Sequence, residues 1–312
     1  MTIRFHTLLL ALLLLGSIAV SRLAFDGGAA VETPHVPVTN AEGTYEASLT
    51  GQIQVVAEAP PGPARRWEVL DPVLMAEAAM VQSLNGQHPF LNYRTYTEWP
   101  LASLTKLITA LVVLEDIGPE KKIPISEAAV ATEGNGGGLT PGEVYTARAL
   151  VKILLHAASK DAAFAFEEFM GGRATFVRLM TKKAEAIGMA RTLVHDASGL
   201  SELNVSTASD LLKLARYITS NAPDIFAWTR LSSFIAQPLN GTESATVENI
   251  NPFVTDRDFL GGKTGTSDEA RQNLLAIFSY EHYRVAVIIL GSSDRVREVN
   301  TIRSWLGKAY MF

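Results

Sequence analysis

Two β-rich runs near the C-terminus constrain the fold more than any other feature of the chain. They occupy residues 272–279 and 283–291 and are separated by three residues. Val285, Val287 and Ile289 alternate along the second run, which is the period of a strand whose successive side chains point to opposite faces of a sheet. Because a connection this short joins antiparallel neighbours, the two runs predict a β-hairpin within an antiparallel sheet.

Helical spacing follows this hairpin and also fills the middle of the chain. Apolar residues after the hairpin predict a terminal helix against one face of the sheet, and they are Val296, Val299, Ile302, Trp305 and Leu306. Further helices are predicted over residues 104–114, 146–168, 173–187 and 207–220. The last of these has Ser206 or Thr207 available as its N-cap.

Shorter extended runs precede the helices, at residues 67–70 and 74–82. The second run is followed by Asn85 and Gly86, a dipeptide typical of hairpin turns. Strands at both ends with helices between them predict an α/β (α+β) fold, in which an antiparallel sheet is flanked by helices and carries an inserted helical lobe.

Three segments of different composition divide the 312 residues. Arg4 precedes an apolar run at residues 8–20, which as a helix would reach about 20 Å of the roughly 30 Å hydrocarbon core of a bilayer. Residues 1–25 are therefore expected to be a signal peptide or an N-terminal anchor of an exported protein. Prolines and glycines predict a tether over residues 26–66, and one compact unit is expected over residues 67–312.

The composition excludes several classes of function. The chain has no cysteine, so a thiol nucleophile, an iron–sulfur cluster and a thiolate zinc site are excluded. Its 6 histidines are scattered without a metal-binding spacing and no phosphate-binding loop occurs, so we expect neither a metal nor a cofactor. With a net charge of −5, the protein lacks the excess of positive charge that attracts a polyanion, so we expect no nucleic-acid partner.

A serine and a lysine three residues apart form the first candidate site. Ser103 stands where a helix should begin, and Lys106 follows on nearly the same face. A serine hydroxyl becomes nucleophilic when an adjacent base takes its proton, and a lysine can be that base when burial or nearby positive charge lowers its pKa. The helix is apolar nearly all round beyond Lys106, which indicates such burial, so both residues are predicted to be catalytic.

A second candidate site begins 160 residues after Ser103 and leads into a predicted strand. Its members, predicted to bind substrate, are Lys263, Thr264, Gly265 and Thr266. The lysine supplies charge, the threonine a hydroxyl donor, and the glycine room for a close approach of backbone. Such an edge favours binding an extended peptide that ends in a carboxylate.

Together the two motifs resemble those of the D-alanyl-D-alanine carboxypeptidases, which are low-molecular-mass penicillin-binding proteins of the serine β-lactamase-like superfamily. Further similarity lies at residues 139–146, 198–200 and 206–211, and the resemblance covers about residues 70–310. It implies a β-lactamase/transpeptidase-like fold and removal of the terminal D-alanine from peptidoglycan stem peptides through an acyl-enzyme. The implied partners are the stem peptide and, as covalent inhibitors, β-lactams.

The resemblance also implies a role for each residue of the two motifs. Ser103 would be the nucleophile that forms the acyl ester, and Lys106 would accept its proton. Lys263 and Thr264 would hold the substrate carboxylate. The backbone N–H groups of Ser103 and Thr266 would form the oxyanion hole.

The chain departs from the family pattern in a motif that faces the nucleophile. The family has Ser-x-Asn followed by Asp-Ala, and aligning on Asp161 and Ala162 places Ala158 at the serine position and Lys160 at the asparagine position. A shift of one residue would make Ser159 the third catalytic residue instead. Arg271 follows Ala270 where the family usually has glycine. The chain ends soon after the predicted terminal helix, so we expect membrane contact only through the N-terminal segment.

Two alternative functions stay open, the first because of Ala158 and Lys160. A catalytically impaired homologue would bind muropeptides or a cell-wall partner without turnover. A β-lactamase would need a base for its deacylating water, which many of these enzymes carry in a Glu-x-x-Leu-Asn loop between the two motifs. The only Glu-x-x-x-Asn spacing here, Glu269 to Asn273, lies after Lys263, so the sequence favours the carboxypeptidase.

Overall fold

The computed structural model describes residues 62–131 and 136–312 in full, and the backbone of residues 38–40, 43–47 and 53–56. The chain divides into two compact units, Met1–Pro61 and Gly62–Phe312. The signal or anchor expected at residues 1–25 lies outside the described residues. No helix in the described part of the chain is both long and apolar enough to cross a membrane.

Three short strands lie within the segment expected to be a tether. They are β1 (Val38–Asn40), β2 (Gly43–Ala47) and β3 (Ile53–Val56), and they pair as an antiparallel sheet in that order. The tether over residues 26–66 stays a prediction. The three strands within it contain β-branched and aromatic residues, which favour extended backbone. Strand β4 (Ala64–Arg65) also pairs with β16 (Tyr310–Met311), so the last residues of that segment join the compact unit.

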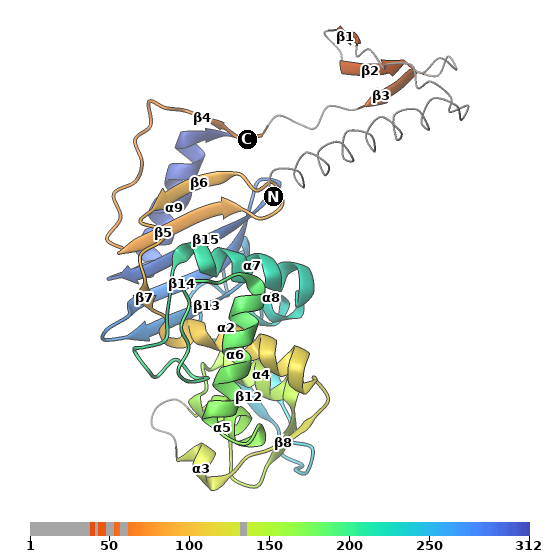
Figure 1. The fold of residues 1–312 in the computed structure, drawn as a ribbon, viewed down its shortest axis with the longest axis vertical. Helices are drawn as coiled ribbons and strands as arrows, with labels where there is room; N and C mark the ends of the chain where they lie inside the picture. The colour runs from red at the N-terminus through yellow and green to blue at the C-terminus, as the bar shows by residue number, and fades with distance from the viewer. Residues whose placement is uncertain (1–37, 41–42, 48–52, 57–61, 132–135) are drawn as a thin grey trace, which may run out of the picture. The chain divides into compact units, whose positions relative to one another are not determined.

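The main sheet of the compact unit has five strands in the order β13-β14-β15-β5-β6, all antiparallel to their neighbours (Figure 1). Their bounds are β5 (Ala78–Ser83), β6 (Pro89–Tyr93), β13 (Phe259–Ser267), β14 (Arg271–Tyr280) and β15 (Tyr283–Ser292). The hairpin predicted near the C-terminus is confirmed as β14 and β15, which pair from Tyr280 and Tyr283 onwards. The run predicted over residues 74–82 contains strand β5, which forms a hairpin with β6 across Asn85 and Gly86.

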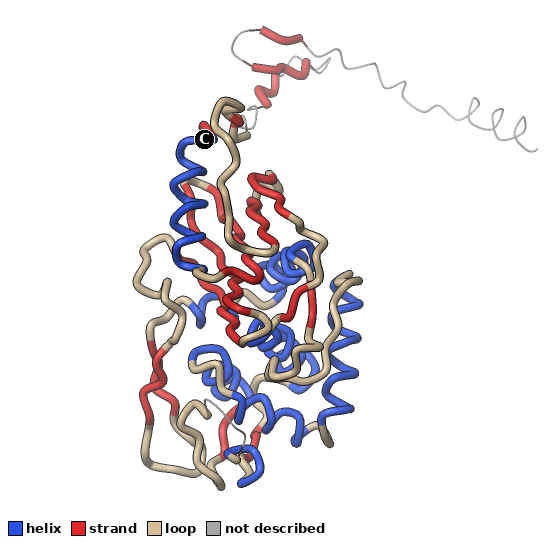
Figure 2. The backbone as a smooth tube through the Cα atoms, turned by 90° about the vertical axis from the view of Figure 1, so that its left-hand side faces the viewer, coloured by secondary structure: helices blue, strands red, loops and turns tan. Residues whose placement is uncertain are grey.

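Side chains of this sheet alternate between two separate cores. Along β14, Leu275 and Ile277 enter the core shared with the helical lobe, whereas Phe278 packs with the C-terminal helix α9 (Arg295–Ala309). Burial of both faces explains why β14 and β15 are continuous apolar runs rather than clean alternations of apolar and polar residues. Figure 2 shows α9 along one face of the sheet, with the other helices gathered beyond the opposite face.

The helical lobe holds the remaining long helices. Its segments are η1 (Ala102–Thr105), α2 (Lys106–Val112), η2 (Val113–Ile117), α3 (Glu127–Val130), α4 (Ala147–His156), α5 (Lys160–Phe169), α6 (Arg173–Ile187), α7 (Ala208–Asn221) and α8 (Asp224–Thr229). Three two-stranded ribbons accompany them: β7 (Trp99–Pro100) with β10 (Val205–Ser206), β8 (Lys122–Pro124) with β9 (Val144–Thr146), and β11 (Ser233–Ala236) with β12 (Ala245–Glu248). Helix α7 has Thr207 as its N-cap, accepting a bond from the Asp210 backbone N–H, as the sequence suggested.

Two local predictions are wrong. Residues 67–70 form a turn rather than a strand, because Trp305 donates a hydrogen bond to the Leu70 carbonyl and Arg65 to the Val69 carbonyl, which holds the segment against α9. The single helix predicted over residues 146–168 is two helices, α4 and α5, separated at Ala158, whose φ is +53°. This left-handed conformation ends a helix because it interrupts the repeating backbone geometry.

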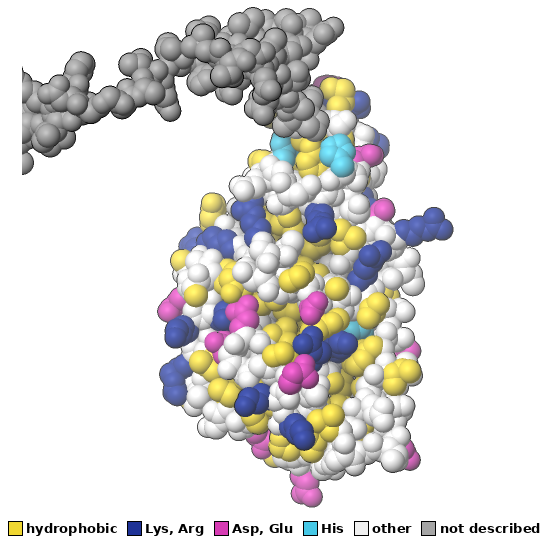
Figure 3. All heavy atoms as spheres, turned by 90° about the vertical axis from the view of Figure 1, so that its right-hand side faces the viewer, with side chains coloured by type: hydrophobic (Ala, Val, Ile, Leu, Met, Phe, Trp, Pro, Cys, Tyr) yellow, Lys and Arg dark blue, Asp and Glu magenta, His cyan; other side chains and the backbone are white. Residues whose placement is uncertain are grey.

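The surface carries both signs of charge. In the face that Figure 3 presents, lysine and arginine side chains are interspersed with acidic side chains and apolar residues. This mixture agrees with the small net charge of −5. The positive charge used at the candidate site is therefore a local feature of a few buried lysines.

Phe278 tests the core between the sheet and α9. It is 2% exposed, and its ring makes an edge contact with Phe253 at 5.5 Å between centroids. Phe278→Ala should lower the free energy of unfolding by about 3–5 kcal/mol, because it removes apolar contacts and leaves a cavity. Tyr96→Ala, at a side chain that is 65% exposed, should change it by less than about 0.5 kcal/mol. Urea denaturation measures both, and equal effects would contradict this assignment of the core.

Candidate active site

The segment that carries Ser103 begins with a constrained turn. Ala102 has a φ of +46°, in the left-handed region that costs a non-glycine residue about 1–2 kcal/mol. Its carbonyl oxygen packs so closely on Gly199 that a Cβ there would lie 1.9 Å away. Ser103 follows, half-buried in η1, where the backbone N–H groups of a helix N-terminus are available to an anion.

Lys106 is a fully buried amine beside this serine. Its Nζ lies 3.2 Å from Ser103 Oγ and donates a hydrogen bond to the Ser198 carbonyl oxygen. Burial, followed by the positive charge of Lys263, lowers the pKa of Lys106 well below its usual value. The amine therefore loses its proton more readily than a lysine in water, which is what a base for the Ser103 hydroxyl requires.

Lys263 is a second buried lysine, on the edge strand β13. Its side chain is 2% exposed, and its Nζ donates to the Thr264 carbonyl at 2.9 Å. Burial and then the charge of Arg295 lower the pKa of Lys263 to about 7. At neutral pH this group is thus partly protonated, and an anion placed against it would stabilise the charged form.

A close approach of backbone brings β13 to the serine segment. A Cβ on Gly265 would lie 2.6 Å from the Leu101 carbonyl oxygen and 3.3 Å from the Leu104 nitrogen, so only glycine fits between β13 and η1. The two predicted motifs are therefore adjacent in space, with Thr266 next to this contact. The substrate-binding role of Lys263, Thr264, Gly265 and Thr266 stays a prediction.

Two residues that the sequence analysis missed hold this contact in place. Asn273 on β14 donates to the Pro100 and Leu101 carbonyls and accepts a bond from the Gly291 N–H. Arg295, the first residue of α9, donates to the Gly265 carbonyl at 3.0 Å and also to Thr266 Oγ1. A single asparagine or arginine has no local sequence signal for such long-range bonds.

Ser159 is the N-cap of α5. Its hydroxyl accepts a bond from the Ala162 N–H at 3.0 Å and donates one to the Gly136 carbonyl at 2.7 Å. The proton of the hydroxyl is thus directed to a loop carbonyl, so a catalytic role for Ser159 stays a prediction that would require this bond to open. Lys160 follows in the first turn of α5, and its charge also lowers the pKa of Lys106.

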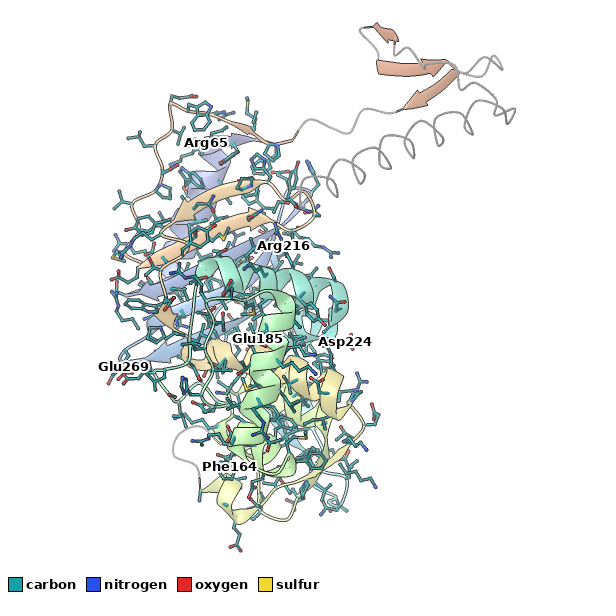
Figure 4. All side chains as sticks on the ribbon, viewed as in Figure 1. Arg65, Phe164, Glu185, Arg216, Asp224 and Glu269 are labelled. Atoms are coloured by element: carbon teal, nitrogen blue, oxygen red, sulfur yellow. The ribbon has the colours of Figure 1, made fainter. Side chains whose placement is uncertain are left out.

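Arg271, another departure from the family pattern, lies at the turn between β13 and β14. Its φ is +51°, a left-handed conformation that glycine adopts most easily. The Arg271 guanidinium lies 5.1 Å from the centre of the Trp99 ring and forms an ion pair with Glu77. Glu269, labelled in Figure 4, is exposed in the same turn.

These groups together can carry out acyl transfer. Ser103 supplies a nucleophilic oxygen, Lys106 a base within reach of its proton, and Lys263 a cation on a strand edge that adjoins them. Among the described residues, no group of three or more histidine, aspartate or glutamate side chains could hold a metal ion.

Comparisons with known proteins agree on one family. The model of the D-alanyl-D-alanine carboxypeptidase family matches residues 68–294. A D-alanyl-D-alanine endopeptidase of Haemophilus influenzae is 33% identical over 241 residues, which are 75% of this chain and 82% of that protein. The D-alanyl-D-alanine carboxypeptidase DacB2 of Mycobacterium tuberculosis is 27% identical over 234 residues, 74% of this chain and 76% of that protein.

Solved structures share the fold. A D-alanyl-D-alanine carboxypeptidase from Mycobacterium tuberculosis superposes with a TM-score of 0.71 at 23% identity, covering 78% of this chain and 96% of that one. The Streptomyces K15 DD-transpeptidase superposes with a TM-score of 0.70, also at 23% identity, covering 76% of this chain and 98% of that one. The antiparallel sheet with an inserted helical lobe is thereby confirmed as this fold.

Gly265→Ala tests the contact between β13 and η1. The added methyl would lie 2.6 Å from the Leu101 carbonyl, so the strand must move away from Ser103. We expect the rate of Ser103 acylation by a fluorescent β-lactam to fall about 10- to 100-fold, because small displacements of reacting groups cost this much. Gly62→Ala is the control, since nothing lies within 4 Å of its added Cβ. Equal acylation rates in both variants would contradict the contact.

Proposed function

The chain belongs to the D-alanyl-D-alanine carboxypeptidase family, and we propose that it is a serine-type hydrolase that removes the terminal D-alanine from peptidoglycan stem peptides. One observation carries this proposal: the buried amine of Lys106 lies 3.2 Å from the Ser103 hydroxyl oxygen. A buried amine with a lowered pKa is the base that an otherwise unreactive serine needs.

In the proposed first step, Lys106 takes the proton of Ser103 while Ser103 Oγ attacks the carbonyl carbon of the penultimate D-alanine. The backbone N–H groups of Ser103 and Thr266 stabilise the oxyanion. The bond to the leaving nitrogen then breaks, the proton passes to that nitrogen, and D-alanine departs. In the second step a water gives a proton to Lys106 and attacks the ester carbon. The ester bond to Ser103 Oγ then breaks, Lys106 passes the proton to that oxygen, and the shortened peptide departs with a new carboxylate.

Substrate binding is proposed to depend on the carboxylate that ends the stem peptide. The Lys263 ammonium and the Thr264 hydroxyl supply a charge-assisted grip on this group. The edge of β13 offers backbone groups to an extended peptide, and Gly265 keeps that edge close to Ser103. The positive charge is local, because the protein as a whole has a net charge of −5.

A second candidate is cleavage within cross-linked peptides. The relative that is 33% identical is named an endopeptidase, as are relatives from Pseudomonas aeruginosa and Escherichia coli at 27% and 26% identity. The chemistry at Ser103 would be the same, and the leaving amine would belong to a second peptide instead of free D-alanine. The two activities therefore differ in the product that leaves first.

The location and partners follow from the proposed substrate. Peptidoglycan lies outside the cytoplasm, and the apolar run at residues 8–20 is consistent with export. We propose that the enzyme works on the periplasmic or cell-wall side. β-Lactams, which mimic the acyl donor, should react covalently with Ser103.

The role of Ser103 is tested by acylation and by product analysis. Fluorescent penicillin should add its mass to the wild-type protein, and Ser103→Ala should abolish this addition. Ser126→Ala, at the N-cap serine of α3, is the matched control and should leave labelling unchanged. An intact mass that does not change after prolonged exposure would contradict the proposal.

With a stem pentapeptide, the wild-type protein should release D-alanine. Cleavage of a cross-linked peptide dimer without this release would favour the endopeptidase. Labelling without turnover of either substrate would favour the impaired homologue, and rapid hydrolysis of the penicillin would favour a β-lactamase.

The lowered pKa of Lys263 predicts a pH dependence. A lysine binds a carboxylate only when protonated, so kcat/KM for a peptide with a free C-terminal carboxylate should fall as the pH rises through about 7. The bound carboxylate stabilises the ammonium, so the fall in kcat should come at higher pH than the fall in kcat/KM. A peptide with an amidated C-terminus should lack this alkaline fall. The same profile for both peptides would exclude Lys263 as the carboxylate ligand.

A further inference from the structure

The buried carboxylate of Asp196 lies outside both catalytic motifs, yet its loop touches the nucleophile segment and the base. We propose that Asp196 is a positioning residue for Lys106: by folding residues 196–201 around its carboxylate, it holds the Ser198 carbonyl against the Lys106 amine. The inference rests on the proposed function, because it assigns Lys106 the role of base.

The Asp196 carboxylate is unusually well bonded for a loop residue. Its Oδ1 accepts from the Ser198 N–H at 2.7 Å, the Ser198 hydroxyl at 2.8 Å and the Gly199 N–H at 2.6 Å. Its Oδ2 accepts from the Ser201 N–H at 2.7 Å. The side chain is 3% exposed, and these bonds lower the pKa of Asp196 although burial opposes them. The carboxylate therefore stays charged and fixes the path of the backbone around it.

The same backbone reaches the Lys106 amine and the backbone just before Ser103. Asp196 accepts a hydrogen bond from the Ser198 N–H, and the Ser198 carbonyl oxygen accepts one from Lys106 Nζ. Gly199, also held by Asp196, packs against the Ala102 carbonyl immediately before Ser103, and its φ of +81° suits glycine. A displacement of this loop would therefore move the base and the nucleophile segment together.

Glu167 and Asn204 bond the backbone at the start of this loop. Glu167 on α5 accepts a bond from the Ala197 N–H at 2.9 Å. Asn204 accepts bonds from the His195 and Asp196 N–H groups, and its carbonyl accepts one from the Leu101 N–H. Neither neighbour bonds the Ser198 or Gly199 backbone, so the part that contacts Lys106 depends on Asp196.

Charge gives the arrangement a second, separable effect. Three charged groups act on the Lys106 amine: the cations Lys263 and Lys160 lower its pKa, and the anion Asp196 raises it. Asp196 thus opposes the two lysines and limits how far the pKa falls. The loop geometry acts on the rate, whereas the charge acts on the pH at which the base becomes available.

Asp196→Asn tests both effects, since asparagine has nearly the same shape without the charge. With a peptide substrate, kcat should fall about 10- to 100-fold because the amine is less well placed. The acid limb of the kcat/KM profile, where activity rises as Lys106 loses its proton, should also move to lower pH. Without the anion, Lys106 loses its proton more easily. A purely structural role would lower the melting temperature and leave the midpoint of that limb unchanged.

Asp210→Asn is the matched control. Asp210 is also buried, at 2% exposure, and it anchors nearby backbone by accepting from the Arg191 N–H at 2.8 Å and from Thr192 Oγ1 at 3.1 Å. It is not among the groups that act on the pKa of Lys106. This variant should lose stability but keep the acid limb where it is.

Asp196→Glu separates geometry from charge, and it decides the question if the asparagine variant does not fold. The longer side chain keeps the anion but displaces the loop, so kcat should fall while the acid limb stays near its wild-type midpoint. The inference is overturned if a folded Asp196→Asn variant keeps the wild-type kcat and an unmoved acid limb. It is also overturned if Asp196→Glu keeps the wild-type kcat. If wild-type Ser103 itself is not acylated, the proposed function fails instead, and the two failures are thereby distinguished.

Discussion

A lysine amine that is completely removed from water is the constraint on which this site depends. Burying a charged ammonium is costly, so the folded chain favours the neutral amine of Lys106. The Ser198 carbonyl oxygen accepts a hydrogen bond from this amine. The carbonyl is effective only if its own position is fixed. The bonds to Asp196 and the packing of Gly199 on Ala102 provide that position, so the chemistry of one side chain depends on the backbone of a loop 92 residues away.

The five-stranded sheet fixes the position of the proposed substrate-binding edge, β13. Strand β13 is held on one side by β14 and meets the nucleophile segment at Gly265. Asn273 and Arg295 then bond the backbone at this contact from β14 and α9, the elements behind it. Because the sheet is covered on both faces, β13 cannot move without disturbing one of two cores. A rigid edge of this kind keeps Lys263 at a constant place beside Lys106.

Local patterns were sufficient to predict the hairpin of β14 and β15, the helix α9 and the two lysine-containing motifs, because each depends on residues close in sequence. Long-range contacts were not predictable in the same way. Nothing near Asp196 or Arg295 in the sequence indicates which distant backbone groups they bond. The break at Ala158 was missed because alanine is a strong helix former, although Ser159 after it is the N-cap of α5. The turn at residues 67–70 is held by hydrogen bonds from Trp305 and Arg65. Long-range contacts, which the local pattern does not contain, decided the bonds of Arg295 and the turn at residues 67–70.

The order of the strands has a consequence for the timing of assembly. Strand β5, made early, pairs with β15, made near the end of synthesis, and the first residue of α9 completes the bonds around Gly265. A partly synthesised chain therefore contains the serine but neither its neighbouring strand edge nor the central sheet. The surroundings of Ser103 are therefore complete only when residues 259–295 have joined the fold.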